Sequence, residues 1–341
     1  MAPANRLKSL ISSSPGKLAC LPGPFTLIPM NTKGTAFTFL LIVLGLVPCI
    51  AEPVRYQDIS STSPWAAHLD FTKLSHPPLD GFLLQVAGFD RVLQLQKILK
   101  EKHAIDWESV EGVTLFGAGD RLSETAIILR GDMEKIDFTS LPIAKNLPLH
   151  HGVKLRQGPD WQESSLMVAR TSDQAWIVGT SLQAAKDSLD LLAGRKESRS
   201  SATLPADAAN ELKSAAAMLS LDMKKLNAEL QFEADFTRAI RQAWFLIGSR
   251  DKLIEATLMI HSTDGEGLLF LQKHLNLLTA LLLAQPDPPA TWLELAGAIK
   301  IKTHGNWMTL KVAASPEKAA VFLKTLEPLF VNAPDSSKQG N

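Results

Sequence analysis

Two parts of this 341-residue chain repeat one another, and this repeat constrains the fold more than any other feature of the sequence. Residues 68–74 match residues 220–226, with Leu, Asp, Lys and Leu in the same places. A second pair of similar segments, residues 181–192 and 315–326, follows in the same order. Because two separate matches keep one order along the chain, we interpret them as an internal duplication that gives two similar halves.

Short apolar runs between turn residues predict the strands. In the first half we expect strands at residues 65–71, 110–117, 125–130, 153–156, 165–169 and 175–178. In the second half we expect them at residues 216–222, 243–247, 254–261, 298–303 and 307–312. Helices are predicted at residues 79–102, 134–146, 181–192, 226–241, 267–284 and 315–326.

Strands joined by such short turns pair antiparallel, which gives the α+β fold class. We expect two similar halves, each an antiparallel sheet with helices packed on one face, in the order β-α-β-β-α-(β)-β-β-α. The predicted boundaries are a first repeat at residues 64–194, a polar linker at 195–205, a second repeat at 206–330 and a disordered tail at 331–341.

The segment from Met30 to Ala51 has the pattern of a bacterial secretion signal. A short cationic start containing Lys33 precedes an apolar run and then Pro48, and small residues precede a cleavage point between Ala51 and Glu52. We therefore expect an exported protein of the periplasm or the extracellular space, with residues 1–29 translated from a start codon placed too early.

Three alternatives to a cleaved signal stay open at this stage. Residues 34–51 could remain as an uncleaved membrane anchor, although Pro48 shortens the apolar stretch below the roughly 20 residues of a spanning helix. Cys49 could be a lipidation site, and residues 1–29 could be a genuine long cationic start.

Removing the first 51 residues changes the charge of the chain. The full sequence has 35 basic and 35 acidic residues, and the removed part holds four basic groups and no acid, so a net charge of −4 remains. This balance argues against a nucleic-acid partner, which selects a basic face. Both cysteines, Cys20 and Cys49, are also removed, so we expect neither a disulfide nor thiol chemistry.

Strong catalytic motifs are missing from the sequence, which makes an enzyme the less favoured interpretation. The catalytic candidates are His68 and Asp70, which are two residues apart on one predicted strand and so share a face. We favour a structural role for both, because the second half keeps the acid as Asp222 but has Ser220 in place of the histidine.

No cofactor and no metal site are predicted. His150 and His151 could supply two metal ligands before a strand, but no Cys, Asp or Glu lies at a recognisable spacing from them. The candidate binding residues are Trp161 and Trp292, in polar or proline-rich segments, together with Asp222.

The predicted helix Gly267–Ala284 is apolar on nearly every side, and only residues 272–274 and 276 form a polar edge. Such a helix must be covered on more than one side. We expect it to lie between the two halves. The alternatives are a homodimer interface, a contact with another envelope protein, or a position against a membrane surface.

The chain resembles a loose family of uncharacterised, predicted-secreted bacterial proteins. The resemblance rests on Trp65–Phe71, Asp106–Gly117 and Gln174–Leu192, and it extends more faintly into the second half. It implies a fold and no established activity.

We therefore predict a secreted or periplasmic, non-enzymatic binding or scaffold protein whose ligand and partner the sequence does not identify. The alternatives are a metal-free hydrolase that uses His68 and Asp70, and a structural subunit of an envelope complex.

Overall fold

The computed structural model describes residues 54–321, apart from gaps at 84–96, 98–99, 102–106, 118–123, 133, 136–144, 162–163, 172–174, 200–205, 231–238 and 285–289. The predicted signal with its cleavage residues Ala51 and Glu52, and the predicted tail, lie outside these residues. So does most of the predicted helix at 79–102.

The elements of the first half are short and follow one another closely. In chain order they are η1 (Tyr56–Asp58), β1 (Trp65–Asp70), α2 (Phe71–Leu74), α3 (Leu79–Leu83), η2 (Trp107–Ser109), β2 (Val110–Gly117), β3 (Thr125–Gly131), β4 (Lys145–Asn146), β5 (Leu155–Trp161), β6 (Ser164–Arg170), β7 (Ala175–Gly179) and α5 (Leu182–Leu192). The second half contains α6 (Ala206–Ser214), β8 (Ala217–Asp222), α7 (Met223–Leu230), β9 (Ile240–Arg250), β10 (Leu253–Ser262), α9 (Gly265–Leu283), α10 (Ala290–Ala298), β11 (Lys300–His304) and β12 (Trp307–Ala314).

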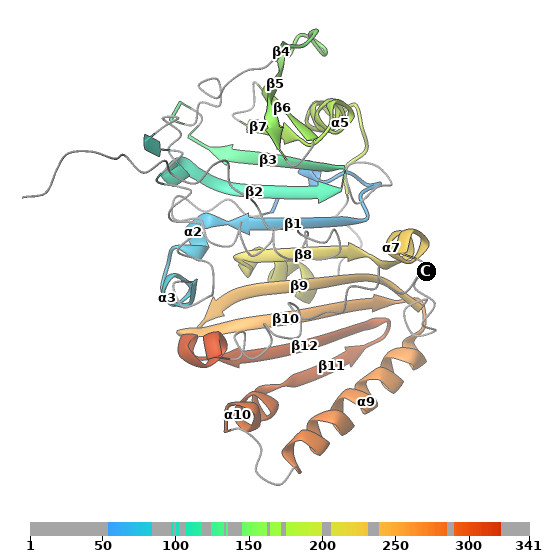
Figure 1. The fold of residues 1–341 in the computed structure, drawn as a ribbon. Coiled ribbons are helices and arrows are strands. Elements are labelled where there is room, and N and C mark those ends of the chain that lie inside the picture. The colour runs from blue at the N-terminus through green and yellow to red at the C-terminus, as the bar shows by residue number, and fades with distance from the viewer. Residues whose placement is uncertain are drawn as a thin grey trace, which may run out of the picture.

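All of these strands belong to one twelve-stranded sheet, in the order β11-β12-β10-β9-β8-β1-β2-β3-β7-β6-β5-β4 (Figure 1). Every pairing in it is antiparallel, as the α+β fold class predicts. The halves do not have separate sheets, because β1 and β8 pair in the middle with Ala67 opposite Leu219. Outward from that pair, the strands of the two halves follow the same order of connections, β1-β2-β3-β7-β6 in the first half and β8-β9-β10-β12-β11 in the second.

The repeated Leu-Asp-x-x-Lys segments make equivalent contacts on the two sides of the β1–β8 pair. Asp70 accepts a hydrogen bond from the Lys73 N–H at 3.1 Å, and Asp222 accepts one from the Lys225 N–H at 3.2 Å, so each carboxylate caps the helix that follows its strand. Each lysine Nζ also reaches across to a backbone carbonyl before the opposite strand. Lys73 contacts residue 213 at 2.6 Å, and Lys225 contacts residue 61 at 2.7 Å. These two acceptors are also 152 residues apart, so the halves correspond in contacts as well as in strand order, while their common origin stays a prediction.

Helices and loops cover both faces of the sheet, rather than the single face expected from the sequence. Side chains alternate along a strand, so Leu69 of β1 packs with α2 and α3, whereas Ala66, three residues earlier, packs with α5 and α6 on the other face. The physical reason is that β1 and β7 are buried on both sides and carry apolar residues at successive positions, so neither face can be left to water.

Two predicted helices differ in the structure. Residues 145–146, at the end of the helix predicted for 134–146, form the short strand β4. The helix predicted for 226–241 begins earlier and ends earlier, because Asp222 caps it directly after β8 and residues 240–241 already belong to β9.

Candidate functional site

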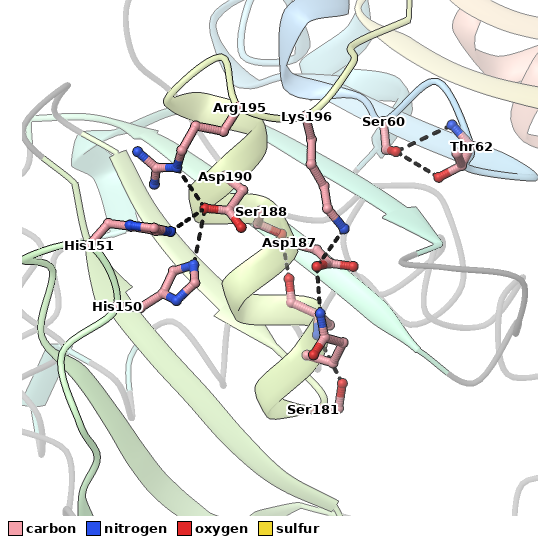
Figure 2. A network of polar contacts seen from close by, with 12 residues as sticks. Ser60, Thr62, His150, His151, Ser181, Asp187, Ser188, Asp190, Arg195 and Lys196 are labelled. Atoms are coloured by element: carbon pink, nitrogen blue, oxygen red, sulfur yellow. Dashed lines mark hydrogen bonds and ion pairs between the residues drawn. The ribbon is translucent and has the colours of Figure 1, made fainter.

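Two adjacent histidines and an aspartate meet where the turn before β5 approaches the last turn of α5 (Figure 2). His150 and Val153 close a two-residue hairpin through backbone bonds of 3.0 and 2.9 Å. The residues between them, His151 and Gly152, have φ values of 48° and 83°, which such a turn requires. Glycine adopts this region readily, but a histidine does so at some cost, so the turn holds His151 beside His150 in a conformation that few side chains favour.

The end of α5 places the acidic partner. Ser181 caps the start of this helix by accepting a hydrogen bond from the Ala184 N–H at 3.0 Å. Gly194, with φ 69°, ends it: its N–H donates to Leu191, and the next N–H, of Arg195, donates to the Asp190 carbonyl at 2.7 Å. This termination fixes the Arg195 side chain close to the Asp190 carboxylate.

One oxygen of that carboxylate is the centre of the cluster. Asp190 Oδ1 lies 3.0 Å from His150 Nε2, 3.6 Å from His151 Nε2 and 2.8 Å from Arg195 Nε. The nearest atoms of the two histidines and the aspartate all lie within 4.8 Å of one another. His150 and Asp190 are largely buried, whereas the His151 side chain is 53% exposed and so opens the cluster to solvent.

Opposing effects act on the pKa of Asp190. Burial raises the pKa, but hydrogen bonds from Arg195 and His150, together with the electrostatic attraction of these groups, outweigh burial and leave the pKa below the ordinary aspartate value. The carboxylate is therefore ionised at neutral pH, although it sits at the negative end of a helix dipole. A cation at this position is favoured by both the dipole and the carboxylate.

A small pocket lies beside the same end of α5. Its volume is about 270 Å³, and its lining includes Arg55, Asp58, Arg130 and Lys196. Arg130 binds Asp58 through two hydrogen bonds of 2.7 and 2.8 Å, and both side chains are buried. The volume is just below the range of typical small-molecule sites, and the internal ion pair neutralises part of its charge.

The catalytic candidates His68 and Asp70 lie in the middle of the sheet, and both are buried. His68 Nδ1 is 2.9 Å from Thr114 Oγ1 on the neighbouring strand, while Asp70 caps α2 and forms an ion pair with Lys73 at 3.0 Å. Each side chain thus has a structural partner. The hydrolase interpretation stays a prediction.

The three candidate binding residues lie far apart in the fold. Asp222 caps α7 and pairs with Lys225 at 3.3 Å, so it occupies the place in the second half that Asp70 has in the first. Trp161 is the last residue of β5, and Trp292 lies in α10. The structure does not bring these three residues into one site.

The apolar helix predicted at 267–284 is α9, and Asp264 caps its start by accepting a hydrogen bond from the Glu266 N–H. Its expected position between the halves is wrong, because the backbone pairing of β1 with β8 already joins them. Instead α9 lies at the far end of the sheet next to β11 (Figure 1). Leu268 is buried there against β10 and β12, but much of the outer face is exposed: Phe270 64%, Leu277 57%, Leu281 55% and Leu269 49%.

No helix among the residues that the structure describes combines the length and the apolarity needed to cross a membrane.

Sequence reasoning considered His150 and His151 as possible ligands but predicted no metal site, and it missed Asp190, the third member of the cluster. Asp190 follows them by 40 residues and reaches them only through the packing of α5, so no local spacing reveals it. The one available signal was the pair of helix ends, Ser181 and Gly194, which places Asp190 in the last turn of α5.

Comparison with known proteins gives a limited result. No protein-family model and no curated protein matches the chain. Among solved structures it is similar to TP0453, a Treponema protein of unknown function. Crystal form III of that protein is 12% identical, with a TM-score of 0.46 over 81% of this chain and 99% of TP0453. Crystal form IV is 11% identical, with a TM-score of 0.47 over 80% of this chain and 97% of TP0453. A likeness of this size carries no argument about function.

Proposed function

We propose that this protein is an exported, non-enzymatic binding protein that holds a partner protein through the outer face of α9. The observation that carries the proposal is the exposure of large apolar side chains along that helix. Contiguous apolar surface on a folded protein is typical of an interaction site, whereas single exposed leucines are ordinary.

The spacing of these side chains supports a single docking face. Phe270, Leu277 and Leu281 are separated by seven and four residues, so they lie along one side of the helix. The Phe270 ring also contacts the imidazole of His274, with ring centroids 3.9 Å apart. A partner that covers these three half-exposed side chains would gain on the order of 1 kcal/mol from each, before the costs of association. A helix or an apolar groove is the partner surface that fits such a face.

The edge of the sheet is a poorer docking surface than α9. Strand β11 is the outermost strand on this side, and it alternates exposed and half-buried residues. Its exposed positions include Lys300 and Lys302. Lysines on an edge strand oppose the addition of another strand, because their charges would be brought close to the incoming chain.

Two further observations support the other parts of the proposal. The buried contacts of His68 and Asp70 account for both residues without chemistry, which supports a non-enzymatic role. The secretion-signal pattern at residues 30–51 supports export. N-terminal sequencing of the cellular protein tests export, and we expect Glu52 as the first residue.

A photocrosslinking amino acid at position 270 tests the docking surface in cells that produce the protein naturally. We expect an adduct of defined mass, which a second substitution, Leu277→Glu, removes. The matched control places the same crosslinker at Lys224, an exposed position in α7 at another part of the molecule. An adduct of twice the chain mass identifies a second copy as the partner, and another mass identifies a different protein. Equal labelling at positions 270 and 224, or no adduct at 270, would contradict the proposal.

A further inference from the structure

We propose that His150, His151 and Asp190 form a binding site for a divalent transition-metal ion of the zinc type. This inference does not depend on the docking surface of α9. It rests on the positions of three ligand atoms that come from two separate elements (Figure 2). Imidazole nitrogen and carboxylate oxygen are ligands that Zn²⁺ and its neighbours in the periodic table accept.

The distances around the shared oxygen fit a tetrahedral ion. With metal–ligand bonds of about 2.0–2.1 Å, two ligand atoms of a tetrahedral site are about 3.3–3.4 Å apart. The separations from Asp190 Oδ1 to the two Nε2 atoms, 3.0 and 3.6 Å, lie on either side of this value. The third separation, between the two imidazole nitrogens, is at most 4.8 Å and closes by a small ring rotation of His151, whose exposed side chain has room to turn.

The backbone favours this arrangement over an ordinary surface pair of histidines. The hairpin turn places His151 at a positive φ, and the two imidazole rings meet edge to face with their centroids 4.4 Å apart. Asn or Gly is the usual residue at this position of the turn, and histidine is among the few other residues that tolerate a positive φ. The turn therefore fixes His151 next to His150 and directs both imidazoles to the end of α5 that carries Asp190.

Charge at the site is also compatible with a bound cation. Asp190 lies in the last turn of α5, where the helix dipole attracts positive charge. Arg195 is the competing group, since its Nε lies 2.8 Å from the same oxygen. Its side chain is 41% exposed, so it can move to the second carboxylate oxygen when an ion takes Oδ1. Three protein ligands leave the fourth position of the ion for water on the exposed side.

Calorimetric titration of the full chain with ZnCl₂ in metal-free buffer tests the proposal. We expect one equivalent of Zn²⁺ to bind. The informative variant is His151→Gly, because glycine removes the ligand and keeps the positive φ of the turn. This variant should weaken Zn²⁺ binding by more than about 10-fold, because loss of a group that only supports a metal ligand already weakens binding by at least about 10-fold. Asp190→Asn should weaken binding similarly.

The matched control is His274→Ala, which removes an exposed histidine from α9 and should leave Zn²⁺ affinity unchanged. Far-UV circular dichroism checks that each variant is folded. If Asp190→Asn does not fold, His151→Gly still tests the proposal. Unchanged affinity in His151→Gly would overturn the proposal, as would the absence of binding by the wild-type chain. Neither result bears on crosslinking at α9.

Discussion

Replacing the two repeated aspartates one at a time separates their structural contributions. Asp70→Ala removes the cap of α2 and the ion pair with Lys73, and Asp222→Ala removes the same two contacts of α7. The chemistry of the two changes is identical. They differ in burial: the Asp70 side chain is fully buried, whereas that of Asp222 is 19% exposed.

The magnitudes follow from these contacts. Loss of a helix cap destabilises a protein by about 1 kcal/mol. Loss of one partner of a fully buried ion pair destabilises a protein by about 3–5 kcal/mol. Lys73 is only partly buried and keeps two carbonyl partners, so loss of its ion pair with Asp70 should cost less than this. We expect Asp70→Ala to lower the free energy of unfolding by about 2–4 kcal/mol, and Asp222→Ala by about 1–2 kcal/mol, since water replaces its lost contacts more readily.

Urea unfolding followed by tryptophan fluorescence and far-UV circular dichroism measures both values. Asp70→Asn is the intermediate case, because asparagine keeps the cap but cannot form the ion pair, and its effect should fall between those of wild type and alanine. The reasoning is refuted if Asp222→Ala is the more destabilising change, or if Asp70→Ala changes the free energy of unfolding by less than about 0.5 kcal/mol, the usual limit for a surface site.

Three further predictions concern other parts of the sheet. Asp58→Ala leaves the buried Arg130 without its carboxylate and should destabilise by about 3–5 kcal/mol in urea unfolding, while a midpoint near that of wild type would contradict the buried ion pair. Burial, and then the charge of Arg241, lower the pKa of His261 below 6.5, so the unfolded chain binds a proton before the folded chain does as the pH falls. Stability should therefore drop below about pH 6.5. Thermal unfolding at pH 7 and pH 5 measures this drop, which should be smaller in His261→Phe. Gly179→Ala should destabilise, since a Cβ there would lie 2.7 Å from a backbone nitrogen in the first turn of α5; an unchanged melting temperature would show that the turn moves freely.

Local sequence signals predicted most strands and the ends of α5, because alternation and capping act over a few residues. The hairpin between β9 and β10 shows their limit. The sequence predicts that the first strand ends at residue 247, before Gly248. In the structure β9 continues through Gly248, which pairs with Glu255, and Asp251 and Lys252 make the turn at φ 52° and 66°. The pairing of the two long strands decides the register, and it overrides the preference of glycine for the turn.

The candidate site and the position of α9 depended on contacts that no short segment contains. His150 and His151 are visible in the sequence, but Asp190 joins them only when α5 packs on β7 and β3. The composition of α9 indicated that neighbours must cover it, without identifying them. The repeat predicted similar halves, yet it did not predict that β1 and β8 would make one sheet, because pairing between two repeats leaves no local pattern.

The β1–β8 pairing has a consequence for how the chain reaches its folded state. The two strands lie about 150 residues apart in sequence, so this pair closes the longest loop in the sheet and should form late in folding. Until it forms, each half presents a six-residue, mostly apolar strand with unsatisfied backbone groups. Because antiparallel pairing is symmetric, β1 of one molecule can then pair with β1 of another. A first half released from the ribosome before the second, or cut from it, is therefore the species most prone to aggregate, and the second half acts as its folding partner in the same molecule.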